Sequence, residues 1–451
     1  MKDFIVMHFL TTRLAKIKDH PRYDYVLGWG KLISYTGGAQ ILVQAVGFLS
    51  GLLIIRLLPV EEYAYYTLAN TMLGTMTLLA DGGINAGVLA EGSKVWKDKN
   101  KLSTVLKTGL ELRKKFAIVS LLISLPILFL LLRDLNADNL TTLLIILSII
   151  PAFFAALSDQ LLEIVPKLHQ EIKSLQVNQG MVASLRLLLL GLLIFIFPLT
   201  YVAILAAGIS RMYGNYKLKN IASPHLVSQS EKSPAVRRKI LKVVYRMFPG
   251  VLYYCFSGQI TIWIISIFGT TSSLAGIGAL GRLSVMLSIF TVAANLLIVP
   301  RFARLPSEQH ILRKRLDQIT MWLVLLFSFA LAFVYFFSKA FLFLLGDSYR
   351  ELGFELTLSF AGACLAAFSA ILFNIATSKG WVLNPAFSIC VGIISIILGV
   401  FLFEISTLNG VLLYSIFISG IQVVQNGAFL YYKIFSLSNH HKSPERGNFL
   451  K

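Results

Sequence analysis

The chain alternates between long apolar runs and short polar interruptions along nearly its whole length. In a bilayer only helices and closed barrels satisfy every backbone polar group, and an apolar helix of about 20 residues is long enough to cross. The pattern predicts an all-α polytopic membrane protein with about 12 transmembrane helices. The expected spans are residues 34–56, 63–90, 114–132, 140–164, 178–197, 199–220, 246–268, 274–300, 319–345, 353–378, 382–403 and 408–434.

The widest polar interval between these spans runs from Asn220 to Lys242 and divides them into two halves. Because each half has an even number of spans, both halves start on the same membrane side, so a repeat would be related by an axis along the membrane normal. We expect two pseudo-symmetric lobes of six helices around a central cavity. The predicted units are an N-terminal tail or interfacial helix at 1–33, an N-lobe at 34–220, a linker at 221–245, a C-lobe at 246–434 and a tail at 435–451.

Composition supports the membrane class. Hydrophobic residues make up 56% of the 451 positions and charged residues 14%, with a mean hydropathy of +0.73, which exceeds what a water-soluble core of ordinary size could bury. The three cysteines, Cys255, Cys364 and Cys390, lie in apolar runs without metal-ligand spacing. The sequence therefore predicts no metal and no cofactor.

The net charge of +19 has a topological explanation that needs no nucleic-acid partner. Lys and Arg number six in the N-terminal tail, eight in 91–115 and nine in 211–246, whereas 57–62 and 269–273 contain none. The positive-inside rule assigns the basic face to the cytoplasm. Both termini are therefore predicted to be cytoplasmic.

A hairpin between two apolar runs is the most informative stretch. Its turn is built on Pro59, and its second run opens on Tyr63, Tyr65 and Tyr66, as is typical of a helix entering at a membrane–water interface. The second run ends in Asp81-Gly82.

This order of residues resembles the first two helices of the polysaccharide-transport family, the Wzx-type O-antigen and capsule flippases. That family belongs to the multidrug/oligosaccharidyl-lipid/polysaccharide exporter superfamily. The matching positions are Arg56, Leu57, Leu58, Pro59, Glu61, Glu62, Tyr63, Asp81 and Gly82. One departure is Ala64, where the family pattern usually has Gly. Beyond the motif, the likeness is one of length, helix count and loop charge over residues 28–435.

The resemblance implies a flippase of the bacterial inner membrane. Its substrate would be a polyprenyl-pyrophosphate-linked oligosaccharide, an O-antigen (lipopolysaccharide) or capsule repeat unit, moved by alternating access. The implied partners are the lipid bilayer, H+ or Na+ as coupling ion, and polysaccharide-assembly proteins. The alternatives are a cation-coupled multidrug exporter and a membrane-bound polymerase or transferase. The sequence has no ATP-binding P-loop and only short outer loops, which argues against a primary pump and against an enzyme.

Ionisable residues at membrane depth are the first candidates for a substrate site. Arg282 and Arg186 lie about eight residues, or roughly 12 Å, into their predicted spans. A guanidinium matches phosphate oxygens, so both could attract a pyrophosphate; the alternative is that each snorkels to its nearer interface. Arg56, at an outer helix end, is expected to anchor at the interface or pair with Glu61 or Glu62, and is a candidate gate residue.

Acidic and amide side chains complete the candidates. Asp81 is a candidate coupling or gate residue, with a structural role between helix ends as the alternative. Asp159 and Glu163 share a helix face with Lys167, which favours an interfacial ion-pair ladder. Amides suit sugar hydroxyls or, alternatively, bonds between helices; the cavity candidates are Gln40, Gln44, Asn70 and Gln259. Gly276, Gly278 and Gly281 predict a close-packing surface.

Overall fold

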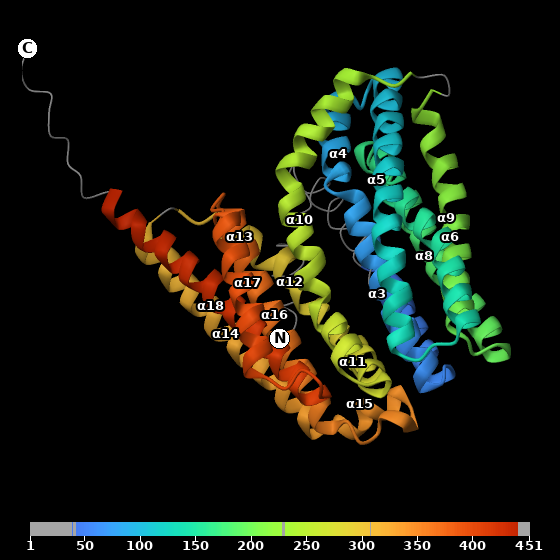
Figure 1. Ribbon diagram of the computed structural model, residues 1–451. Helices are drawn as coiled ribbons and strands as arrows, with labels where there is room; N and C mark the ends of the chain where they lie inside the picture. Colours follow the sequence, from blue (N-terminus) through green and yellow to red (C-terminus); the bar gives the residue numbers. More distant parts are fainter. Residues whose placement is uncertain (1–37, 39–41, 228–230, 307, 441–451) are drawn as a thin grey trace, which may run out of the picture.

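The computed structural model describes residue 38 and residues 42–227, 231–306 and 308–440 (Figure 1). Throughout these residues the regular elements are helices. The predicted interfacial helix at 1–33, the candidate Gln40 and the end of the C-terminal tail lie outside this part of the chain.

The first half of the chain forms one group of helices. The first helix, Leu42–Leu57, carries no label in Figure 1. The labelled helices that follow are α3 (Val60–Asp81), α4 (Ile84–Val95), α5 (Lys99–Asp134), α6 (Asn139–Leu162), α7 (Ile164–Leu168), α8 (Ile172–Ile196) and α9 (Thr200–Ala222), with the 3-10 turn η1 (Ser223–His225) after them.

The second half forms another group. Its elements are α10 (Pro234–Phe268), α11 (Thr271–Ser284), η2 (Val285–Leu287), α12 (Ser288–Leu297), α13 (Val299–Ala303), α14 (Gln309–Phe336), α15 (Ser338–Leu345), η3 (Asp347–Tyr349), α16 (Gly353–Ser378), α17 (Pro385–Leu402) and α18 (Leu408–His440). The long helix α10 begins at Pro234, inside the interval predicted as linker.

The two groups are the N-lobe and the C-lobe. In Figure 1 the blue-to-green N-lobe helices and the yellow-to-red C-lobe helices lie on either side of α10 and converge where α11 and α15 lie. We call this the joined end. Helix α11 packs along α3, whereas α10 contacts α3, α4 and α5 in the N-lobe and also α11, α17 and α18 in the C-lobe.

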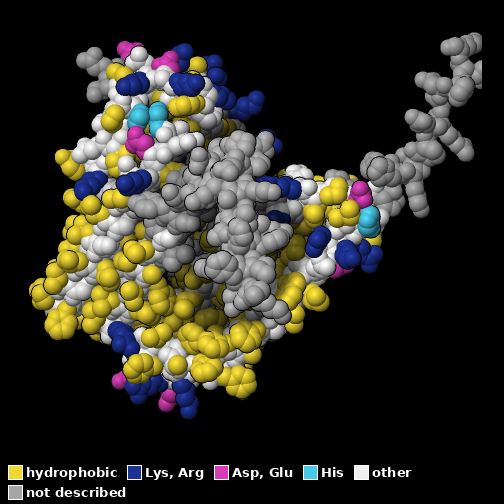
Figure 2. Space-filling model, turned by 180° about the vertical axis from the view of Figure 1, so that it is seen from behind, with side chains coloured by type: hydrophobic (Ala, Val, Ile, Leu, Met, Phe, Trp, Pro, Cys, Tyr) yellow, Lys and Arg dark blue, Asp and Glu magenta, His cyan; other side chains and the backbone are white. Residues whose placement is uncertain are grey.

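Length and composition identify nine helical stretches in the described chain that could cross a membrane. The other three predicted spans correspond to Leu42–Leu57, which is shorter, and to α3 and α9, which are more polar. Figure 2 shows a broad hydrophobic belt between charged side chains gathered at both ends of the molecule. The predicted fold class, an all-α membrane protein of about 12 spans in two lobes, is confirmed.

Three spans expected to be continuous are broken. Residues 63–90 divide into α3 and α4 because Gly82 (φ 51°) and Gly83 (φ 94°) adopt left-handed conformations that glycine allows without a Cβ penalty. Residues 274–300 change helix type at η2, and 319–345 break at Phe337. Apolar residues continue on both sides of each break, so a prediction from hydropathy alone treats the two parts as one span.

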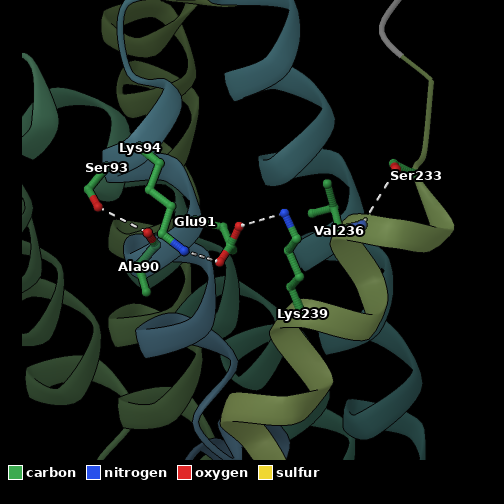
Figure 3. Close-up of polar contacts among 7 residues, drawn as sticks. All are labelled: Ala90, Glu91, Ser93, Lys94, Ser233, Val236 and Lys239. Carbon is green, nitrogen blue, oxygen red and sulfur yellow. Dashed lines mark hydrogen bonds and ion pairs between the residues drawn. The ribbon is translucent and has the colours of Figure 1, made fainter.

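A separate apolar core fastens the start of α10 to the N-lobe. Its buried residues are Ile84, Val88, Leu102, Val105, Leu106, Leu112, Leu161, Ile164, Val165, Ala222, Ile240 and Val244. Ion pairs border it: Glu91 of α4 lies 2.6 Å from Lys94 and 3.7 Å from Lys239 of α10, and the Ser233 hydroxyl accepts the Val236 amide to cap α10 (Figure 3). Exposed pairs contribute little, about 1 kcal/mol or less, so apolar burial carries this attachment.

We expect Gly109→Ala to lower the melting temperature, because a Cβ there would lie under 3.0 Å from Val88 Cγ2. Overpacking of this kind costs about 1–3 kcal/mol. Thermal unfolding in detergent checks this, with Gly74→Ala as the matched control, since a Cβ at Gly74 meets nothing within 4 Å. The double change Gly109→Ala/Val88→Ala should recover part of the loss. Equal melting temperatures for Gly109→Ala and Gly74→Ala would contradict the packing argument.

Candidate functional site

A cavity of about 390 Å³ lies between the lobes near the joined end. Helix α3 contributes one wall, and α10, α11, α16 and α18 contribute the others. Hydroxyl and amide groups dominate its polar surface. They belong to Tyr63, Tyr66, Thr67, Asn70, Thr71, Thr261, Ser284, Ser359, Ser415 and Ser419. Among the described residues that line it, Arg282 is the one ionised side chain.

Arg282 is half-buried where three helices meet. Its stem packs against the first helix, since a Cβ at Gly51 would lie 3.4 Å from Arg282 Cδ. The guanidinium interacts electrostatically with the phenols of Tyr63 and Tyr66 on α3. Within the described chain, Arg282 forms no ion pair with a carboxylate, whereas Arg113, Arg313 and Arg350 do. A cation held by neutral phenols keeps its attraction for an anionic ligand.

Close packing between α3 and α11 seals the cavity at the joined end. A Cβ at Gly278 would lie under 3.0 Å from Thr67 Oγ1, so only glycine permits this approach. The Tyr63 ring meets the buried Tyr349 ring edge-on, with centroids 6.4 Å apart. Burial raises the pKa of the Tyr349 phenol, which therefore stays neutral in this seal.

Arg56 fastens the same end from the outside. Its Nη2 donates to the Phe343 carbonyl at 2.6 Å and its Nε donates to the Leu344 carbonyl at 2.9 Å. Both acceptors lie in the last turn of α15, where a cation is favoured by the helix dipole. The expected partners Glu61 and Glu62 are not used; the Glu62 carboxylate instead accepts the Thr200 amide at 2.7 Å. Arg56 thus joins the first helix to the C-lobe.

Asp81 lies away from the cavity, at the α3–α4 break. Its carboxylate accepts the amides of Gly83 and Asn85 and forms a 2.8 Å ion pair with Arg113, which is 2% exposed. The Arg113 guanidinium also donates to the Gln160 side chain. These contacts correspond to the structural alternative for Asp81, whereas a coupling role stays a prediction.

Arg186 does not line the cavity with Arg282. Its Nε is buried without a hydrogen-bond partner in the described chain, and it lies in the electrostatic field of Arg211 on α9. Arg211 also faces Asp159 on α6 and Tyr66 on α3. These half-buried residues form a charged cluster in the N-lobe, and Tyr66 is within electrostatic range of both Arg211 and Arg282.

Sequence reasoning missed this charged cluster. It counted Arg211 among the loop bases, although that residue lies in the middle of the predicted span 199–220. It also placed Asp159 in a surface ladder, of which the structure has only the Glu163–Lys167 pair at 2.7 Å. A basic residue in the middle of one predicted span and an acidic residue near the end of another were the signal that could have indicated the cluster.

The amide candidates divide. Asn70 lines the cavity, Gln259 is half-buried on α10 without lining it, and Gln44 is exposed on the first helix. Other membrane amides bond between helices: Asn374 donates to Asn295 at 2.9 Å, and Asn426 donates to the Ser369 hydroxyl at 2.9 Å. The glycine prediction is confirmed for Gly278 and for Gly276, which packs on Leu408, and is wrong for Gly281, where a Cβ would meet nothing within 4 Å.

Neither a family model nor a curated protein sequence matches the chain. Its fold is that of membrane transporters of the MOP superfamily. A multidrug resistance MATE family transporter of that superfamily, in an inward-facing conformation, matches with a TM-score of 0.67 at 13% identity, covering 89% of this chain and 96% of that chain.

Two further solved structures extend the comparison. The lipid II flippase MurJ in an inward closed conformation gives a TM-score of 0.68 at 11% identity, covering 92% of this chain and 94% of that one. An outward-facing MATE family transporter gives 0.59 at 13% identity, covering 89% and 95%. At these identities the likeness establishes the fold alone. This fold agrees with the superfamily that the sequence predicts, while membership of the polysaccharide-transport family stays a prediction.

We expect Gly278→Ala to open the joined end, because a methyl group there forces α11 away from Thr67. A cysteine placed at Asn70, in a background without Cys255, Cys364 and Cys390, should then react faster with a membrane-impermeant thiol reagent. Gly281→Ala, on the same helix but facing open space, is the matched control. Unchanged reactivity in Gly278→Ala would show that this contact does not hold the seal.

Asp81→Ala should destabilise the fold by about 3 kcal/mol, because it leaves the Arg113 guanidinium buried without its charge partner. The double change Asp81→Ala/Arg113→Met should regain much of that loss, since no buried charge remains. Thermal unfolding of purified protein checks both. A double variant no more stable than Asp81→Ala would contradict an ion pair as the main role of Asp81.

Proposed function

We propose that this chain is a flippase for a polyprenyl-pyrophosphate-linked oligosaccharide of O-antigen or capsule type. The observation that carries the proposal is the guanidinium of Arg282, which has no carboxylate partner among the described residues and faces a cavity whose other described lining residues are uncharged, with hydroxyl and amide groups. A pyrophosphate supplies the charge that Arg282 lacks, and the guanidinium presents donors in a planar geometry that phosphate oxygens match.

The rest of the cavity suits the sugars of such a substrate. Asn70, Thr71, Ser415 and Ser419 offer donors and acceptors for hydroxyl groups, and Tyr63 and Tyr66 present aromatic faces. The polyprenyl tail needs no pocket in the protein, because it stays in the bilayer while the polar headgroup passes between the lobes.

Loop charge gives the proposed orientation. The turn at Pro59 and the turn before Thr271 lack basic residues, so we assign the joined end to the outer membrane face and both termini to the cytoplasm. The cavity is then closed to the outside in this conformation. The higher TM-score with the inward-facing than with the outward-facing MATE structure supports this assignment.

Alternating access would then require the seal to open. The contacts to be broken include the Gly278–Thr67 approach, the Tyr63–Tyr349 ring contact and the hydrogen bonds of Arg56. Arg56 binds backbone carbonyls near the exposed surface, where water can replace it at low cost. We assign Arg56 the role of a latch on the outer gate.

A cation-coupled multidrug exporter is the second candidate, favoured by the MATE fold and by Asp159 in the N-lobe. The sign of the charge in the cavity argues against it, because Arg282 would repel a cationic drug. The two functions therefore make opposite demands on the same side chain, and one set of proteoliposomes distinguishes them.

In proteoliposomes with a fluorescent polyprenyl-pyrophosphate oligosaccharide, we expect Arg282→Gln to reduce flipping about tenfold or more. Loss of a charge-assisted hydrogen bond costs roughly 1.5–3 kcal/mol. Arg350→Gln is the control, since Arg350 is exposed and pairs with Asp347 at the surface.

Two results would change the conclusion. If the wild type moves the lipid and Arg282→Gln equals Arg350→Gln, the site is wrong while the function stands. If the wild type moves no lipid but expels a cationic dye, the exporter takes its place.

A further inference from the structure

Arg56 is a second cation near the joined end without a negative partner in the described chain. Its guanidinium donates to the Phe343 carbonyl at 2.6 Å and to the Leu344 carbonyl at 2.9 Å, and lies 5.5 Å from the centre of the Phe343 ring. By contrast, Arg350 at the same end pairs with Asp347 at 2.6 Å. The latch is thus an exposed guanidinium held by two neutral carbonyls.

Phosphate oxygens are stronger partners for a guanidinium than these carbonyls are. A guanidinium–phosphate pair combines opposite charges with parallel hydrogen bonds in a planar geometry, whereas a carbonyl offers only a dipole. Because Arg56 is exposed, water can also take over the carbonyls that it leaves. A phosphate that reaches Arg56 can therefore displace α15 from it.

The first helix places Arg56 outward of the cavity cation. Arg282 packs beside this helix at Gly51, where a Cβ would lie 3.4 Å from Arg282 Cδ. Arg56 follows five residues later, which at 1.5 Å per residue is a rise of roughly 7.5 Å toward the joined end. The two cations therefore mark successive depths along one helix, the first at the cavity and the second at its outer end.

The surface around Arg56 suits a phosphate that is linked to a lipid. Helix α15 is too short to cross a bilayer, and it lies at the joined end in Figure 1. Phe337, Phe343 and Leu344 are 52%, 60% and 38% exposed there, and exposed aromatic rings are typical of the membrane–water interface. A phosphate on Arg56 is then at headgroup level, and a polyprenyl chain attached to it can lie in the adjoining leaflet.

The carbonyls that hold Arg56 belong to the segment that closes the cavity. Gly346 ends α15 with φ 104° and ψ 176°, a conformation restricted almost entirely to glycine, and η3 follows at once. The last residue of η3 is Tyr349, which is buried against Tyr63 in the seal. Release of α15 by Arg56 thus removes an attachment of the segment that carries the seal.

We propose that the lipid-linked pyrophosphate takes Arg56 from α15 and thereby opens the outer gate, so that Arg56 is both the latch and an exit subsite. This inference rests on the proposed function. Phosphate oxygens replace the carbonyls of Phe343 and Leu344 on the guanidinium, and the segment with Tyr349 loses its attachment to the first helix. When the product leaves into the outer leaflet, Arg56 returns to α15 and the gate closes.

Calorimetric titration of the full-length protein in detergent with farnesyl pyrophosphate tests the subsite. We expect Arg56→Gln to weaken binding about tenfold, through loss of a charge-assisted hydrogen bond. A latch alone predicts no loss or the opposite sign, because a freer gate lowers the cost of forming an open bound state. Arg350→Gln, at an exposed arginine of the same end, should bind like the wild type. Unchanged or tighter binding in Arg56→Gln would overturn the proposal.

The distance between two spin labels reports the gate itself. In a background without the native cysteines, Glu61→Cys on α3 and Ser348→Cys in η3 place labels at exposed positions on the two lobes beside the seal. We expect farnesyl pyrophosphate to lengthen this distance in the otherwise unchanged protein. In Arg56→Gln the longer distance should be present without ligand and change little on its addition. A ligand response as large as that of the parent protein would show that the phosphate does not act through Arg56.

Arg282→Gln separates this inference from the proposed function. If Arg282→Gln loses binding and Arg56→Gln does not, the exit subsite fails while the function stands; if the wild type binds no farnesyl pyrophosphate, both fail. Inorganic pyrophosphate that binds as tightly as farnesyl pyrophosphate would make Arg56 a site for free pyrophosphate and refute the lipid assignment.

Melting temperatures show whether each variant is folded. If Arg56→Gln is not, Arg56→Lys decides, because it keeps the charge but not the planar pair of donors. It should bind farnesyl pyrophosphate more weakly than the wild type and more tightly than Arg282→Gln. Wild-type affinity in Arg56→Lys would count against the subsite.

Discussion

The close contact between α3 and α11 is the constraint on which the rest of the arrangement depends. Because Gly278 has no side chain, Thr67 can approach the α11 backbone, and Tyr63 is brought against Tyr349. The same approach sets Arg282 beside Tyr63 and Tyr66. The seal and the charged wall of the cavity are thus two results of one helix–helix contact, which is why a small residue is needed there.

The two lobes contribute unequal chemistry to the molecule. In the N-lobe, Asp81 pairs with the buried Arg113, and the half-buried Asp159, Arg186 and Arg211 form a second group of charges. The C-lobe brings Arg282 to the cavity, whereas ion pairs of this lobe such as Arg350–Asp347 lie at the surface. A ligand between the lobes therefore meets a cation and hydroxyl groups but no fixed negative charge in the described lining, which fits an anionic and hydroxylated headgroup.

Most of the fold follows from local sequence, because hydrophobic length is a property of each segment. The breaks do not: Gly82 and Gly83 interrupt an apolar run whose hydropathy does not change. The site was predicted in part, since Arg282 and Asn70 line the cavity whereas Arg186 does not. The partners of Arg56 lie nearly three hundred positions away in α15, and no local pattern could have named them.

Tyr66 gives the cavity a physical connection to the charges inside the N-lobe. Its phenol is an electrostatic neighbour of Arg282 on one side and of Arg211 on the other, and Arg211 in turn faces Asp159. An anion that binds Arg282 changes the field felt along this series, because charges at such depth are only weakly screened. Binding in the cavity and ionisation inside the N-lobe are therefore energetically linked, and linkage of this kind is reciprocal. The same helix, α3, carries Tyr63, Tyr66 and the close contact with Gly278 of α11, so this series of electrostatic contacts passes beside the seal.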